Sequence, residues 1–179
     1  MREFRDDQGR PWQVALTVAA AMRVKDNVMV EVEGEKKPFD MIDVASISTT
    51  MQVLRGQYTT LAEALYAILT AQVAQKGLSK EQFLDGLRGD SLDAGAKALE
   101  AELIDFFPER LRRMVGLLAA KMDEAATELM AKAEKAMRET TTADLLEASG
   151  MPSTRPPESS ASTPGSGPSE SSAPLATAA

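Results

Sequence analysis

Apolar residues alternate with polar residues near the start of this chain and recur every three or four positions in its second half. In the first segment, Phe4 and Trp12 flank an Asp-Asp-Gln-Gly stretch that ends at Gly9, and a glycine there is suited to positive φ. Trp12, Val14 and Leu16 then fall on one face of an extended segment. These positions predict an N-terminal β-hairpin.

A short helix and a second extended segment follow the predicted hairpin. Thr17 is suited to cap a helix that reaches Val24 or Lys25. Valines alternate with Met and Glu over residues 28–32, which predicts a strand, and the Gly-Glu-Lys-Lys-Pro sequence at 34–38 predicts a turn. Because an isolated two-stranded hairpin is marginally stable, we expect about three short strands to form one small antiparallel sheet.

The pattern becomes helical beyond Met41, although Ser and Thr dilute the period over residues 42–55. Further along, Ser or Thr stands three positions before Glu or Gln at two places, which is the spacing of a capping box at a helix start. Glycines after apolar periodic runs are suited to end helices. The expected signals are the pairs Thr60–Glu63 and Ser79–Gln82, the C-terminal glycine Gly77, and a cap at Asp90 or Ser91 after Gly89.

A long final helix is predicted from Pro108 to about Glu139, because proline is tolerated in the first turn of a helix. Apolar side chains recur along it at alternating spacings of four and three, which is the pattern of a coiled-coil seam. The seam weakens where Lys132 takes the next position. Its residues are Leu111, Val115, Leu118, Met122, Ala125 and Leu129.

Three occupants of this seam remain open. It can pack on preceding helices of the same domain, pair with a second copy of the chain, or receive a helix from another protein. Methionines along the same helix suit an adaptable apolar surface, although Met also simply fills gaps in cores. The candidate partner-binding residues are Leu111, Met114, Val115, Leu118, Met122 and Leu129.

The composition argues against an enzyme. The 179 residues include no His and no Cys, the side chains that supply most general bases, nucleophiles and transition-metal ligands. Acidic pairs such as Asp6–Asp7 and Glu100–Glu102 have ordinary roles in turns and on exposed helix faces. No Gly-rich phosphate loop or metal-ligand spacing accompanies them. We therefore expect a protein without catalytic residues, cofactor or metal.

Charge and hydropathy narrow the classes of partner that this chain is expected to bind. The formal net charge of −7 opposes binding to a nucleic-acid backbone, which needs a surplus of Lys and Arg on one face. No apolar run approaches the roughly 20 residues of a membrane span. Acidic residues near the N-terminus interrupt the place of a signal-peptide core. We expect a cytoplasmic protein that binds neither nucleic acid nor membrane.

Together these features predict an α+β fold in which a small N-terminal antiparallel hairpin or sheet precedes a mainly helical bundle with a long C-terminal helix. Residues 1–45 would hold the hairpin or sheet with the short helix, and residues 46–148 the bundle of the same domain. Residues 151–179 contain eight Ser and six Pro, which bury too little apolar area to offset the entropy of ordering. We therefore expect residues 149–179 to be a disordered tail.

Several short motifs resemble a group of small phage and prophage proteins, the tail assembly chaperones. The resemblance covers about residues 4–130 and departs at residues 28–45, where members of the group usually carry a Gly-Val-Asp-Leu-Leu-like stretch and this chain begins Val-Met-Val-Glu-Val. The matching stretches are Phe4-x-Asp6-x2-Gly9-Arg10-x-Trp12, residues 16–25, Leu65 to Leu69, Gly77 to Phe83, Gly89 to Ala94, and Ala98 to Pro108.

The resemblance implies a non-enzymatic function with no catalytic residues. Such chaperones are encoded beside the tape-measure gene of long non-contractile tails and coat the apolar, helical tape-measure protein before the tail tube assembles around it. In several of them a translational frameshift adds a C-terminal extension that recruits tail tube subunits. The expected partner is thus a phage tape-measure protein, and the tail tube protein and a second copy of the chain are further candidates. The alternative is a structural tail or head–tail connector component of the phage particle.

Overall fold

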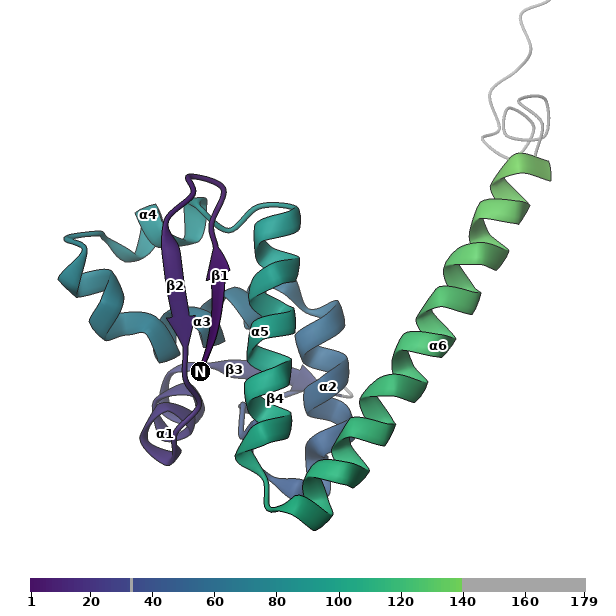
Figure 1. Cartoon of the computed structure of the whole chain (residues 1–179), viewed down its shortest axis with the longest axis horizontal. Helices are drawn as coiled ribbons and strands as arrows, with labels where there is room; N and C mark the ends of the chain where they lie inside the picture. Colours follow the sequence, from purple (N-terminus) through teal and green to yellow (C-terminus); the bar gives the residue numbers. More distant parts are fainter. Residues whose placement is uncertain (33, 140–179) are drawn as a thin grey trace, which may run out of the picture. The chain divides into compact units, whose positions relative to one another are not determined.

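The computed structural model describes residues 1–32 and 34–139, and their fold is α+β (Figure 1). Residues 1–132 form one unit, and residues 133–139 are the described start of a second. The predicted tail and residues 140–148 of the predicted bundle lie outside the described residues. In chain order the elements are β1 (Arg2–Arg5), β2 (Pro11–Val14), α1 (Val18–Asn27), β3 (Met29–Val32), β4 (Glu35–Pro38), a 3-10 turn (Val44–Ser46), α2 (Ile47–Gly56), α3 (Tyr58–Gln75), α4 (Lys80–Asp85), α5 (Asp90–Phe106) and α6 (Glu109–Glu139).

The predicted N-terminal hairpin is confirmed. Strands β1 and β2 pair antiparallel with Phe4 opposite Trp12, and Gly9 closes the turn with a φ of 76°. Both aromatic side chains are buried, and Trp12 meets Phe83 of α4 edge to face at 4.9 Å between ring centroids. β1 lies along α5 and β2 contacts α3, so the hairpin covers part of the helical layer (Figure 1).

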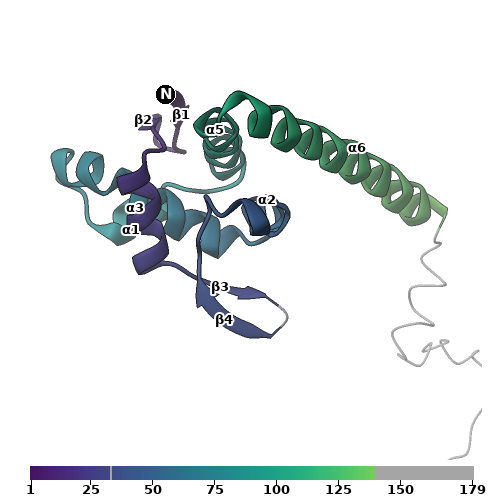
Figure 2. The same ribbon diagram turned by 90° about the horizontal axis from the view of Figure 1, so that it is seen from below.

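The prediction of a single three-stranded sheet is wrong. Among the described residues the strands form two separate two-stranded sheets, β1 with β2 and β3 with β4 (Figure 2). Residues 35–38 were predicted as a turn but form β4, and Gly34, with a φ of 81°, lies in the connection between β3 and β4. All four β4 side chains are exposed, so the strand carries no alternation of apolar and polar residues that could identify it.

Three of the predicted helix ends are confirmed. The Thr17 hydroxyl accepts the Ala20 N–H at 3.1 Å and begins α1, which continues past the expected Lys25 to Asn27. Gly77 follows α3 with a φ of 68°, and the adjacent Leu78 N–H bonds back into the last turn of α3. The capping box of α4 forms in full: Ser79 Oγ accepts the Gln82 N–H at 3.2 Å, and Gln82 Oε1 accepts the Ser79 N–H at 2.9 Å.

Two predicted caps are wrong. Helix α3 begins before Thr60, whose hydroxyl bonds to the Gln57 side chain at 3.2 Å, and Glu63 pairs with Lys80 at 2.6 Å instead of capping. The N-cap of α5 is Gly89 itself, with no side-chain cap. Ser91 lies inside the helix and accepts the N–H of a preceding loop residue. In both cases the side chain found a tertiary or loop partner that local spacing does not reveal.

Helix α3 lies at the centre of the helical layer and contacts α1, α2, α4 and α5 (Figure 1). Its approach to α5 requires a residue without a side chain: a Cβ at Gly95 would lie 2.9 Å from Leu65 Cδ1. One hydrophobic core therefore joins the helices and the first hairpin. Its largest fully buried side chains are Trp12, Phe83, Met41, Met51, Leu54, Leu61, Leu65, Leu69, Leu99 and Leu103.

Candidate functional site

The first half of α6 packs on the hydrophobic core through its apolar stripe. Val115 and Ala119 are 1% and 5% exposed and belong to the core. Leu111, Leu118 and Met122 are half-buried against it. Because an α-helix turns about 100° per residue, these five positions lie within one face roughly 100° wide.

The start of α6 is fixed by the end of α5. Pro108 was expected as the first helical residue, but it precedes α6, and its carbonyl accepts the Arg112 N–H at 2.9 Å. The Arg112 guanidinium also donates to the carbonyls of Asp105 at 3.0 Å and Phe107 at 3.3 Å. A cation at those carbonyls satisfies unpaired acceptors at a helix C-terminus. The turn between the two helices is therefore closed by the first residues of α6.

An arginine of α2 marks the place where α6 leaves the core. Arg55 binds Glu100 of α5 through two hydrogen bonds, at 2.9 Å and 2.5 Å, and its Nη1 lies 3.1 Å from Asp123 Oδ1 of α6. The hydrogen bonds to Glu100 raise the pKa of the Arg55 guanidinium above its ordinary value. Arg55 thus joins α2, α5 and α6 through one side chain.

Beyond Met122 the apolar stripe of α6 continues without cover. Every described side chain from Asp123 to residue 138 is exposed. Ala125, Ala126, Leu129 and Met130 extend the same face that Val115 and Met122 occupy in the covered part. Leu129 is 67% and Met130 75% exposed. We call these four residues, Ala125, Ala126, Leu129 and Met130, the open stripe.

The six candidate partner-binding residues therefore divide between the core and solvent. Val115 lies in the core, and Leu111, Leu118 and Met122 are half-buried. Met114, which is 49% exposed, and Leu129 face solvent. Ala119 was missed, because a strict heptad is narrower than the stripe that actually packs; a count of all apolar positions within about 100° would have found it.

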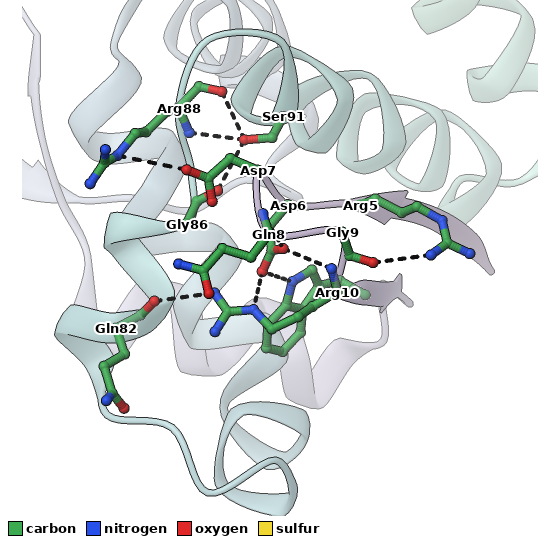
Figure 3. Close-up of polar contacts among 11 residues, drawn as sticks. Arg5, Asp6, Asp7, Gln8, Gly9, Arg10, Gln82, Gly86, Arg88 and Ser91 are labelled. Carbon is green, nitrogen blue, oxygen red and sulfur yellow. Dashed lines mark hydrogen bonds and ion pairs between the residues drawn. The ribbon is translucent and has the colours of Figure 1, made fainter.

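A second polar feature surrounds the turn of the first hairpin (Figure 3). The buried Asp6 carboxylate accepts four hydrogen bonds: the N–H groups of Gln8 at 3.1 Å and Arg10 at 2.9 Å, Arg10 Nε at 2.6 Å, and Trp12 Nε1 at 2.9 Å. Burial raises the pKa of Asp6, but the hydrogen bonds from Trp12 and Arg10 outweigh it and leave the pKa below 3.8. A carboxylate so saturated with donors stabilises a turn.

The same cluster ties the hairpin to α4 and to the loop that follows it. The Asp7 N–H donates to the Gly86 carbonyl at 3.0 Å, and Arg10 Nη2 donates to the Gln82 carbonyl at 3.3 Å (Figure 3). A Cβ at Gly86 would lie 2.6 Å from Arg10 Nη2, so a side chain at this position would displace the guanidinium from its present place. The cluster positions the hairpin.

The acidic pairs of the sequence do not converge on a shared site. Asp6 faces Arg10 and Trp12, whereas Asp7 lies 3.9 Å from Arg88. In α5, Glu100 binds Arg55. Glu102 instead accepts the Leu16 N–H at 3.4 Å and pairs with the Met1 amino group at 2.7 Å. Each carboxylate thus has its own structural partner.

An open groove of about 440 Å³ lies between β3 and the start of α3. Gln57 Nε2 donates to the Glu31 carbonyl of β3 at 3.3 Å across it, and Thr60 and Glu63 line the α3 side. Within the described part of the chain, no three side chains are placed to hold a metal ion together. No helix among the described residues is both long enough and apolar enough to cross a membrane.

Comparison with known proteins adds no assignment. No protein-family model matches this chain, and no curated protein and no solved structure matches it either.

Proposed function

We propose that this chain is a non-enzymatic chaperone that binds an apolar helical segment of a client protein along the open stripe of α6. The observation that supports the proposal is the exposure of Leu129 and Met130 on the same face that Val115 buries in the core. An apolar face that continues into solvent favours a partner, because contiguous exposed apolar surface is uncommon on monomeric proteins.

The chemistry of the open stripe suits a helical client. An amphipathic helix docks by laying its own apolar face against such a surface. The two alanines let the backbones approach closely, and Met130 adapts its shape to different side chains. Full burial of Leu129 and Met130 would contribute about 1.5–3 kcal/mol each before the costs of association. Binding of that strength is reversible, as a chaperone that later releases its client requires.

The proposed identity of the client rests on the resemblance of the sequence to tail assembly chaperones. We propose that it is a phage tape-measure protein, held in the host cytoplasm during tail assembly, and that the tail tube protein is a second partner. The residues proposed to contact the client are Leu129, Met130 and the two alanines of the open stripe.

The experiment is co-expression of the chain with an apolar helical fragment of the tape-measure protein encoded beside it. We expect the fragment to remain in the supernatant with the wild-type chain and with Ala131→Glu, which adds a charge outside the open stripe. Leu129→Glu should lose this protection, because it places a charge within the stripe. Equal precipitation with and without the chain, or full protection by Leu129→Glu, would contradict the proposal.

Leu118 is a poor choice for this test. Its side chain is half-buried against the core, so Leu118→Glu would disturb the fold as well as any client contact.

Mass spectrometry of purified phage particles distinguishes the proposed chaperone from the alternative, a structural tail component. A chaperone is absent from the particle, whereas a structural subunit is present in stoichiometric amount.

A further inference from the structure

The sheet of β3 and β4 has two edges among the described residues, and only one of them is protected against further pairing. On the outer edge, β4 carries Lys36 and Pro38, and proline has no N–H group. Lysine and proline are common devices that keep an edge strand from pairing with another chain. The edge formed by β3 has neither residue, and it borders the open groove of about 440 Å³ beside the start of α3.

The register of the sheet shows which main-chain groups lie on the β3 edge. In an antiparallel ladder, alternate residues bond to the partner strand, and the residues between them point away from it. The Phe39 N–H donates to the Val28 carbonyl at 2.9 Å. Met29 comes next and lies opposite Pro38, which has no N–H to give. Met29 and Glu31 therefore present their N–H and C=O groups to the groove.

One of these groups already has a partner from α3. Gln57 Nε2 donates to the Glu31 carbonyl at 3.3 Å. In the part of the chain that the structure describes, no loop or side chain bonds to the Glu31 N–H or to the main chain of Met29. Unpaired main-chain groups on a strand edge are a template for another extended segment. The Gln57 amide thus takes the place that a main-chain N–H of an added strand would fill.

We propose that this groove binds an extended segment of another polypeptide, which joins the edge of β3 as a third strand. Main-chain hydrogen bonds provide the affinity in this mode of recognition. The groove lining mixes acidic, basic and uncharged side chains, so no charge of one sign selects the ligand. These side chains include Glu31, Glu63, Lys36, Thr59 and Thr60. The site therefore recognises an extended backbone and suits many β-strand-forming sequences.

The width of the groove favours a single strand over a second copy of this sheet. The side chain of Gln57 alone spans from α3 to the edge of β3. One added strand needs roughly 4.8 Å beside its neighbour. A second copy of the chain would bring β3 with β4 still paired to it, which is a ribbon two strands wide. The occupant is thus a lone extended segment.

The probe for the test is an end-capped pentapeptide of alternating threonine and valine, which is uncharged and favours an extended backbone. Titrated to about 5 mM against the isotope-labelled full chain, it should shift the amide NMR signals of Met29 and Glu31 and the side-chain amide signal of Gln57. The expected Kd is on the order of 1 mM, because few hydrogen bonds form. The same peptide methylated on every backbone nitrogen keeps its side chains but donates no N–H, and it should bind at least about tenfold more weakly.

Variants of the chain separate the main chain from the side chains. Glu31→Pro removes an outward N–H group and should weaken binding at least about fivefold. Glu31→Thr is the matched control, because it removes the same charge but keeps the N–H, and it should bind within about twofold of wild type. Gln57→Ala removes the competing amide and should strengthen binding by about twofold. Hydrogen exchange of the Phe39 N–H, which bonds to Val28, checks that the sheet is intact in each variant.

Three results would overturn the proposal: no shift at Met29 and Glu31, equal binding of the fully methylated peptide, or weaker binding by Gln57→Ala. These results decide even where Glu31→Pro disturbs the sheet. Shifts of the same signals with protein concentration alone would assign the edge to a second copy of the chain and would also overturn it. The test involves neither α6 nor a client, so its failure is distinguishable from failure of the tape-measure proposal.

Discussion

Arg55 Nη1 lies 3.1 Å from Asp123 Oδ1, one residue after the last side chain of α6 that the core covers. The two partners are unequal in exposure: the Arg55 side chain is 21% and that of Asp123 74% exposed. Arg55 also holds Glu100, which is 17% exposed. The Asp123 contact therefore marks the boundary of the core. The more buried contact with Glu100 contributes more to the stability of the fold.

This inequality gives a first prediction. Arg55→Ala leaves the half-buried Glu100 carboxylate unpaired and should lower the free energy of unfolding by about 1–2 kcal/mol. Asp123→Ala removes only an exposed ion pair and should cost less than about 0.5 kcal/mol. Urea unfolding of the two single variants and the double variant measures both effects. Equal losses from the single variants would contradict the assignment.

Shortening a side chain should lower the free energy of unfolding in the covered part of the α6 stripe but hardly change it in the open stripe. Val115→Ala removes two methyl groups from the core and should cost about 1–2 kcal/mol. Leu129→Ala removes a side chain that is already in solvent and should change stability by less than about 0.5 kcal/mol. Thermal and urea unfolding check the pair. A Leu129→Ala loss as large as that of Val115→Ala would mean that Leu129 is buried in solution.

The buried carboxylate of the first hairpin gives a third prediction. Asp6→Ala leaves Trp12 Nε1 and the Arg10 side chain without their acceptor and should cost about 2–4 kcal/mol. The neighbouring Asp7→Ala is the control: it removes only a 3.9 Å ion pair with Arg88 and should cost less than about 0.5 kcal/mol. Urea unfolding at neutral pH distinguishes a buried anchor from a surface charge.

The lowered pKa of Asp6 makes stability depend on acid pH. The folded pKa lies below the ordinary 3.8, so the unfolded chain binds a proton first as the pH falls. The stabilisation from Asp6 is therefore complete well above pH 3.8 and is lost below it, down through the folded pKa. The urea midpoint of wild type should fall more steeply than that of Asp6→Asn between about pH 5 and pH 2. Parallel curves would contradict this role.

Local sequence signals predicted those parts of the fold that depend on neighbours along the chain. The hairpin around Gly9, the Thr17 cap and the Ser79–Gln82 box each rest on residues within a few positions of one another, and each formed. Strand β4 could not be predicted, because an exposed edge strand needs no apolar residue. The predicted capping box of Thr60 and Glu63 did not form, because the Thr60 hydroxyl bonds to the Gln57 side chain instead.

The candidate site, too, could be predicted from the sequence only in part. The seam spacing identified the apolar face of α6 correctly, since periodicity alone determines which side chains share a face. It gave no sign of where the core stops covering that face. That boundary lies where Arg55 of α2 reaches Asp123 of α6, and these two residues are far apart in sequence.

The edge of the core at Met122 has a mechanical consequence for any helix that binds beyond it. Such a helix finds uncovered apolar surface only away from the core, because the core already covers the same face of α6 from Leu111 to Met122. The edge of the core therefore limits the binding surface at one end only. It would set the alignment of a bound helix even where the apolar contacts are unspecific.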